Sequence, residues 1–390
     1  MPAFLGQLDV WVVIIYLAAM LLIGWYVTDG SRDVEGYTVG NRQMRGWVIG
    51  MSVLGTFLSS ITFLAVPAQV YKDGNCNAYV FGMALPIAAV VAVYYFIPLY
   101  RSRVQLSAYE LLEQRFGYWA RGYAAVSFLA LQTLRVGMVL LLVAYAVQPL
   151  LNWGIVNTLF AISLVVIVYD VMGGIKAVIW TDVVQVFVLT LGALWCLLTM
   201  VNAHSGWGAF WQAIPERSFS LGSWDITDLS TSTFFVVLIY GISENMRNYG
   251  TDQNYVQRML CAADSKEAAK SIWLGALSYL PISAIFCLIG TGLHVYYHVP
   301  LPKPEPGAVV SNAAPALPKS PQQLPADAKA DEIFPHFIKH ELSPLARGLV
   351  VAGILAAAMT TGRSMPAARN RMTSSTPVRC GSSFSVSSRA

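Results

Sequence analysis

Arg135 is the residue whose position most needs a chemical explanation. It stands in the apolar run LQTLRVGMVLLLVAYAVQ, about 14 residues into a segment long enough to cross a bilayer, or roughly 20 Å along a helix. An ionisable group at that depth in hydrocarbon is costly and marks a functional site by default. A guanidinium there could hold a carboxylate through two parallel hydrogen bonds. The alternative is a structural ion pair or a clamp on backbone carbonyls.

Asp182 is a second charged residue in an apolar context. It stands in KAVIWTDVVQVFVL, about one or two helical turns from the basic end of its segment. A carboxylate at this position could ligate Na⁺ or gate the inner mouth of a pathway across the membrane. The alternative is a helix-end charge near the membrane interface, and position alone leaves both readings open.

Two further segments mix polar residues into apolar runs. Residues 50–71, GMSVLGTFLSSITFLAVPAQVY, combine glycines, hydroxyl residues and Pro67. Such a segment suits either close helix packing or an unwound stretch whose carbonyls bind an ion. Residues 240–258, YGISENMRNYGTDQNYVQR, bring acidic, basic and amide side chains in after an apolar run. For them the alternative is an early helix end followed by a cytoplasmic loop.

The elements that must position these residues are membrane-spanning helices. The chain is 56% apolar and 12% charged, against about 25% charged in a soluble domain. Strands are not expected, because the apolar segments lack barrel alternation and an open sheet cannot satisfy its backbone in lipid. The first segment lacks a basic n-region and a cleavage site, so we expect it to be retained. Spans are predicted at about 8–27, 46–71, 78–99, 121–150, 154–172, 177–202, 232–256, 271–298 and 345–361, nine in all.

Composition and motifs argue against several other functions. The net charge of +4 is small and the basic residues lie between apolar segments, so no nucleic-acid partner is expected. None of the five cysteines forms a CxxC pair, so neither a disulfide framework nor a zinc site is expected. The sequence contains no HExxH or GxSxG motif and is not expected to be an enzyme.

Loop charges predict the orientation in the membrane. The connections 28–45, 100–120 and 257–270 are basic, whereas 72–77, 151–153 and 203–231 are nearly neutral. Because cytoplasmic loops carry an excess of Lys and Arg, we expect the basic connections in the cytoplasm. This places the N-terminus and the Pro- and Ala-rich loop 299–333 on the extracytoplasmic side. The expected location is the cell membrane (plasma or inner), crossed several times.

Four stretches resemble the sodium:solute symporter family, which includes sodium-coupled sugar, sialic acid and monocarboxylate carriers. The Gly-Gly pair followed by TDxxQ and the run GTDQxxVQR are together specific. The resemblance covers about residues 5–361 and is carried by LSSITFLAVPAQVY (58–71), VYDVMGGIKAVIWTDVVQ (168–185), NYGTDQNYVQRMLCAADSKEA (248–268) and GLVVAGILAAAMTT (348–361).

This resemblance implies an all-α polytopic membrane protein with the inverted-repeat transporter fold. In that fold one extra N-terminal helix precedes two five-helix repeats of opposite orientation, and the first helix of each repeat is broken near the midplane. The symporter domain is expected over 1–361, with 46–202 as the first repeat and 232–361 as a partial second repeat. The loop charges independently make the first segments of the two repeats enter the membrane from opposite sides.

The resemblance also implies a sodium site. In the family, carbonyls of the unwound first core helix bind the ion, and these positions match Gly55 and Leu58. A hydroxyl on the eighth core helix matches Thr360. Asp182 matches a carboxylate that supports a second sodium ion in some members. Na⁺ is therefore the expected co-transported ion.

The implied solute site consists of Ser59, Thr62 and Arg135, which match the carboxylate-binding positions of the sialic acid carriers. Met83 departs from the pattern, because those carriers have a glutamine there. An organic anion is therefore expected as the solute, with sialic acid itself in question.

The tail 362–390 does not resemble the family. It is rich in Ser and Arg, begins inside an apolar helix and is expected to be disordered. Arg363 and Ser364 stand where the family has the serines of its sodium site, and a cation there would repel Na⁺. We interpret the tail as a change of reading frame near codon 362, after which the chain inserts into the membrane but does not transport.

The predicted function is sodium-coupled symport of a small organic solute, such as sialic acid or another organic anion, by alternating access. Its expected partners are the solute, the sodium ion and the lipid bilayer. The alternative is a membrane-embedded sensor or scaffold with a transporter-like body, which would need a soluble signalling domain.

Overall fold

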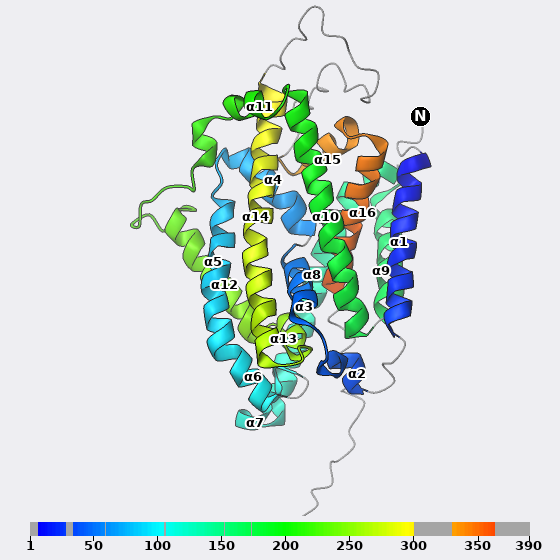
Figure 1. Cartoon of the computed structure of the whole chain (residues 1–390), viewed down its shortest axis with the longest axis vertical. Helices are drawn as coiled ribbons and strands as arrows, with labels where there is room; N and C mark the ends of the chain where they lie inside the picture. The colour runs from blue at the N-terminus through cyan, green and yellow to red at the C-terminus, as the bar shows by residue number, and fades with distance from the viewer. Residues whose placement is uncertain are drawn as a thin grey trace, which may run out of the picture.

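The structure is a computed structural model that describes residues 7–28, 34–58, 60–104, 107–151, 153–172, 174–299 and 330–362. These ranges are almost wholly helical, and their only β-type contact is an isolated bridge between Met44 and Ala262. Most of the predicted loop 299–333 and nearly all of the predicted tail 362–390 lie outside them. Figure 1 shows long helices running side by side, with short helices at both ends of the bundle.

Helices occupy all nine segments that were predicted to span. They are α1 (Gln7–Thr28), α3 with α4 (Gly46–Phe57 and Ser60–Asp73), α5 to α6 (Ala78–Val91, the π-helical η2 Ala92–Phe96 and Ile97–Arg103), α8 (Tyr118–Leu151), α9 (Ile155–Met172), α10 (Ile175–Ala203), α12 (Phe234–Thr251), α14 (Ser265–His298) and α16 (Pro344–Gly362). The shorter helices are α2 (Val34–Val39), η1 (Gly40–Arg42), α7 (Glu110–Phe116), α11 (Trp207–Ala213), η3 (Glu216–Phe219), α13 (Gln253–Leu260) and α15 (Ala330–Glu341).

Length and hydropathy single out some of these helices as spans. Within the described residues, 4 helices are long and apolar enough to cross a membrane, and the bent pair α3–α4 makes 5 if it counts as one span. The four are Ala78–Arg103, Tyr118–Tyr145, Ile175–Ala203 and Ser265–His298. Shorter apolar stretches lie in α1, α9 and α16. The figure of nine spans stays a prediction.

The first predicted break is present between α3 and α4, whose axes differ by 50°. Leu58 leaves the helical conformation with φ −83° and ψ 71°, and its N–H donates to the Leu54 carbonyl. The Thr62 hydroxyl donates to the Phe57 carbonyl at 2.9 Å. These two bonds occupy carbonyls of the last turn of α3, which have no partner within a helix that ends there.

A second break separates α12 from α13 at Asp252, which is extended at φ −79° and ψ 118°. The Asp252 carboxylate caps α13 by accepting from the Asn254 backbone N–H at 2.9 Å. The polar segment 240–258 therefore forms two consecutive helices with a capped junction, not a helix followed by a loop.

The central helix α14 packs against the first repeat through glycines. A Cβ on Gly275 would meet the Val53 side chain at 2.9 Å, so α14 touches α3 there. A Cβ on Gly290 would lie 2.6 Å from the Val70 Cβ and 2.7 Å from the Pro67 carbonyl oxygen, so α14 also touches α4. Small residues at such contacts let helices approach closely, as is usual in membrane bundles.

The connections with similar charge meet at the same end of the bundle. Among the basic connections, Met44 and Cys261 share a backbone hydrogen bond of 3.1 Å, and Arg101 donates to the Ala262 carbonyl at 2.9 Å. At the opposite end the Cys76 N–H donates to the Ser220 carbonyl at 2.8 Å. In Figure 1, α2, α7 and α13 lie at the lower end and α11 and α15 at the upper end.

Candidate solute and cation site

The two broken helices meet side by side. The ring of Phe57, the last residue of α3, lies 5.9 Å from the ring of Tyr249 and 4.9 Å from that of Tyr255, measured between centroids. These two tyrosines flank Asp252, where α12 ends and α13 begins. All three rings are buried. The packing of aromatic side chains thus brings two interruptions of the backbone together, although they are far apart in the sequence.

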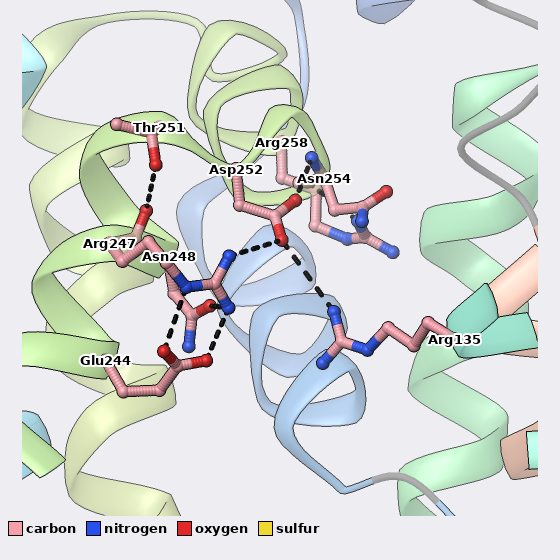
Figure 2. A network of polar contacts seen from close by, with 8 residues as sticks. All are labelled: Arg135, Glu244, Arg247, Asn248, Thr251, Asp252, Asn254 and Arg258. Atoms are coloured by element: carbon pink, nitrogen blue, oxygen red, sulfur yellow. Dashed lines mark hydrogen bonds and ion pairs between the residues drawn. The ribbon is translucent and has the colours of Figure 1, made fainter. Parts of the chain in front are cut away.

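Arg135 reaches toward this junction from α8. Its Nη1 lies 3.8 Å from Oδ2 of Asp252, and Nη1 of Arg247 lies 3.9 Å from the same oxygen. Figure 2 shows the two guanidiniums approaching the carboxylate from different directions. Arg247 also forms a two-point ion pair with Glu244, in which Nε donates to Oε2 at 2.9 Å and Nη2 donates to Oε1.

The contact of Arg135 with Asp252 is loose. A hydrogen bond between nitrogen and oxygen spans about 2.7–3.2 Å, so 3.8 Å is an ion pair without a hydrogen bond. The Arg135 side chain is 39% exposed, whereas that of Asp252 is 4% exposed. The guanidinium therefore makes no hydrogen bond to Asp252 and is partly exposed beside the second break. The contact with Asp252 is at the same time the structural ion pair that the alternative reading expects.

Asp182 lies in a different polar group, which is fully buried. Its Oδ2 accepts from the Ser52 hydroxyl at 2.5 Å and from Nη2 of Arg258 at 2.9 Å. Arg258 further donates from Nε to the Ser52 Oγ at 2.8 Å and from Nη1 to the Asn254 carbonyl at 2.8 Å. This group ties α10, α3 and α13 together, and it gives Asp182 a cationic partner inside the protein.

Of the positions predicted to bind sodium, Gly55 lies close to Asp182. A Cβ on Gly55 would meet the Val186 side chain at 3.1 Å and the Asp182 carbonyl oxygen at 3.5 Å, so α3 passes close to α10 there. Gly353 of α16 faces Leu189 of α10, and Gly192 of α10 faces Val350 of α16, so these two helices pack antiparallel. Leu58 is buried at the break.

Not every predicted site residue is described. Ser59 and the side chain of Thr360 lie outside the described part of the structure, as does the tail with Arg363 and Ser364. Thr62 lies in α4, one turn after the break, and its hydroxyl donates to the Phe57 carbonyl. The structure thus places Thr62 at the first break, Arg135 at the second, and Gly55 close to Asp182.

Sequence reasoning did not identify Asp252, Arg247 and Arg258 as partners of the predicted residues. A usable signal was present, because the run RNYGTDQNYVQR places one acidic and two basic side chains where apolar residues dominate on either side. Charged groups inside a membrane protein usually pair with one another.

Comparison with known proteins agrees with this geometry. The model of the sodium:solute symporter family matches residues 37–368. The Sodium/sialic acid symporter SiaT of Proteus mirabilis (strain HI4320) is 33% identical over 352 residues, which are 89% of this chain and 66% of that protein. The Sodium/sialic acid symporter NanT of Aliivibrio fischeri (strain ATCC 700601 / ES114) is 27% identical over 365 residues, 91% of this chain and 67% of that protein.

A further relative and a solved structure are also similar to this chain. The Sodium-coupled monocarboxylate transporter 1 of Xenopus laevis is 27% identical over 306 residues, and this chain spans 48% of its length. A solved structure of a Na⁺-coupled sialic acid symporter, in a substrate-bound outward-open state, superimposes with a TM-score of 0.83 at 30% identity. That match covers 98% of this chain and 77% of the other.

The structural match confirms the inverted-repeat fold, which is the fold of a class of multi-pass membrane transporters. The match of the family model over most of the chain shows to which family the chain belongs. The chain belongs to the sodium:solute symporter family.

Proposed function

We propose that the protein is a secondary transporter that moves a small organic acid together with Na⁺ by alternating access. The observation that carries this proposal is Arg135, whose guanidinium lies 3.8 Å from Asp252 at the second break and, among the described residues, makes no hydrogen bond to that carboxylate. In transporters of this kind, solute and ions bind where the first helices of the repeats are interrupted. Because the chain spans 66% of the first relative's length, its own activity remains part of the proposal.

The residues divide into two roles. Arg135 binds the solute carboxylate through its guanidinium, and Ser59 and Thr62 complete the solute site. Gly55, Leu58, Thr360 and Asp182 form the sodium region. Coupling follows if solute and Na⁺ both stabilise one conformation of the two repeats, since a ligand shifts an equilibrium only through differential affinity.

The test is uptake of radiolabelled N-acetylneuraminic acid into proteoliposomes with an inward Na⁺ gradient. Wild-type protein should accumulate the acid with Na⁺ outside and not with K⁺, and this result would refute the expectation, drawn from the tail 362–390, that the chain inserts without transporting. Arg135→Ala should abolish uptake, whereas Arg115→Ala, at an exposed site on α7, should not. Uptake that is unchanged in Arg135→Ala would remove the carboxylate role. Sodium-dependent binding without flux would instead favour the sensor or scaffold alternative.

We further infer that the protein lies in the cell membrane with its basic end in the cytoplasm and its N-terminus outside. The support is that the three basic connections meet at one end of the bundle. A cysteine introduced at Glu216, on the neutral end, should react with a membrane-impermeant maleimide on intact cells. One introduced at Lys266, on the basic end, should react only after lysis. The reverse pattern would invert the orientation.

A further inference from the structure

We propose that Asp252 is the resting counter-ion of Arg135 and occupies the place that a solute carboxylate takes on that guanidinium. The acid and Asp252 then compete for the same donors. This inference rests on the proposed function, because it assigns a competitor to the same binding group.

The first argument is the geometry of the pair. Arg135 contacts Asp252 at 3.8 Å, too far for a hydrogen bond, and this is the only ion pair of Arg135 among the described residues. A solute carboxylate that accepts two short hydrogen bonds from the guanidinium would be a better partner than this one. The present contact neutralises Arg135 without holding it.

The second argument is that Asp252 is fixed while Arg135 is not. Oδ1 of Asp252 accepts the capping hydrogen bond from the Asn254 N–H at 2.9 Å, and its side chain is 4% exposed. The carboxylate is therefore anchored at the start of α13. The Arg135 side chain is long and 39% exposed, so the guanidinium is the member of the pair that is able to move.

The third argument is the charge around Asp252 once Arg135 has turned from Asp252 to a solute carboxylate. Nη1 of Arg247 lies 3.9 Å from the same Oδ2, so Asp252 keeps a cation beside it. Arg247 in turn is held by two bonds to Glu244 and one of 3.0 Å to Asn248. Figure 2 shows this arrangement, with Arg247 and Arg135 on different sides of Asp252. The exchange thus leaves Asp252 paired with Arg247. A buried carboxylate without a cation beside it would be strongly unfavourable.

The substitution that isolates this role is Asp252→Asn. Asparagine caps helices about as well as aspartate, so the start of α13 is preserved while the charge is removed. With its competitor gone, Arg135 should bind N-acetylneuraminic acid about tenfold more tightly, as measured by calorimetry on the purified full chain in Na⁺. Asp331→Asn, at an exposed site on α15, is the matched control and should bind like wild type. A weaker or unchanged affinity in Asp252→Asn would overturn the proposal.

A second measurement needs no solute and separates this inference from the proposed function. Thermal unfolding midpoints of wild type, Asp252→Asn, Arg135→Gln and the double variant form a cycle that isolates the interaction of the pair. Asp252→Asn should lower the midpoint less in the Arg135→Gln background than in wild type. Additive shifts would show that the two side chains are not paired, whatever the solute. A coupled cycle in a protein that binds no acid would refute the proposed function, and with it the competition, while leaving the ion pair of Arg135 and Asp252 in place.

Discussion

The guanidinium of Arg258 and the carboxylate of Asp182 lie 2.9 Å apart, and their side chains are only 4% and 0% exposed. The pair joins residues 76 positions apart in the sequence and is completed by the Ser52 hydroxyl. A buried ion pair adds little net stability over apolar replacements, but the loss of one member leaves an uncompensated charge.

Arg258→Met should therefore destabilise the protein by about 3–5 kcal/mol, since it leaves the Asp182 carboxylate buried without its cation. The double variant with Asp182→Leu should recover much of that loss. Thermal unfolding in detergent measures both effects. If the double variant were no more stable than Arg258→Met, the pair would not be the source of the loss.

The same pair bears on the sodium prediction for Asp182. Since Arg258 already neutralises the carboxylate, Arg258→Gln should lower the Na⁺ concentration that half-saturates sodium-dependent thermal stabilisation, by about tenfold. Adding Asp182→Asn should abolish that gain. A half-saturating concentration that is the same in wild type and Arg258→Gln would argue against a cation at Asp182.

The contact of α14 with α4 gives a prediction about packing. Gly290→Ala places a Cβ 2.7 Å from the Pro67 carbonyl oxygen, so the two helices must separate. We expect a loss of about 2 kcal/mol, in the range of overpacked cores. Gly137→Ala is the control in α8, where a Cβ meets nothing within 4 Å, and it should be neutral or slightly stabilising. Equal unfolding midpoints for the two variants would contradict the tight contact.

Histidine protonation at α15 should make stability depend on pH. Burial, with contributions from His336, Lys339 and Arg347, lowers the pKa of His340 to about 4. As the pH falls, His340 therefore binds a proton in the unfolded chain before it does so in the folded protein. Its contribution to stability is fully present above about pH 6.5 and is lost as the pH drops toward 4. The effect should be about 1 kcal/mol, reduced from the full linkage value because the side chain is partly exposed.

The measurement is the unfolding midpoint between pH 7 and pH 4. His340→Gln should flatten its decline, because it removes the group that takes up the proton. A decline that is the same in His340→Gln and wild type would exclude His340 as its source.

Much of the fold followed from local signals in the sequence. The apolar segments located the helices. The glycine and hydroxyl pattern of 50–71 was compatible with the break at Leu58, which the family resemblance implied. Periodicity and hydropathy are local properties of the sequence, so they predict individual helices well. The depth of Arg135 in its apolar run also identified a side chain that reaches the junction of the broken helices.

The partners of the charged residues could not be predicted in the same way. Asp252 meets Arg135 of α8, and Arg258 meets Asp182 of α10, only because the fold brings these side chains together in three dimensions. Spacing along one helix carries no information about such contacts. The predicted change of reading frame and the roles of Ser59 and Thr360 stay predictions, since those positions or their side chains lie outside the described residues.

The ring of Phe57 between Tyr249 and Tyr255 has a mechanical consequence. The three rings contact one another, with 5.8 Å between the centroids of the two tyrosines, so they join the two breaks through side chains. In the proposed alternating access, a change of angle at one break would reach the other through these rings, without a continuous backbone between them. The stiffness of this joint depends on the size of the ring at position 57.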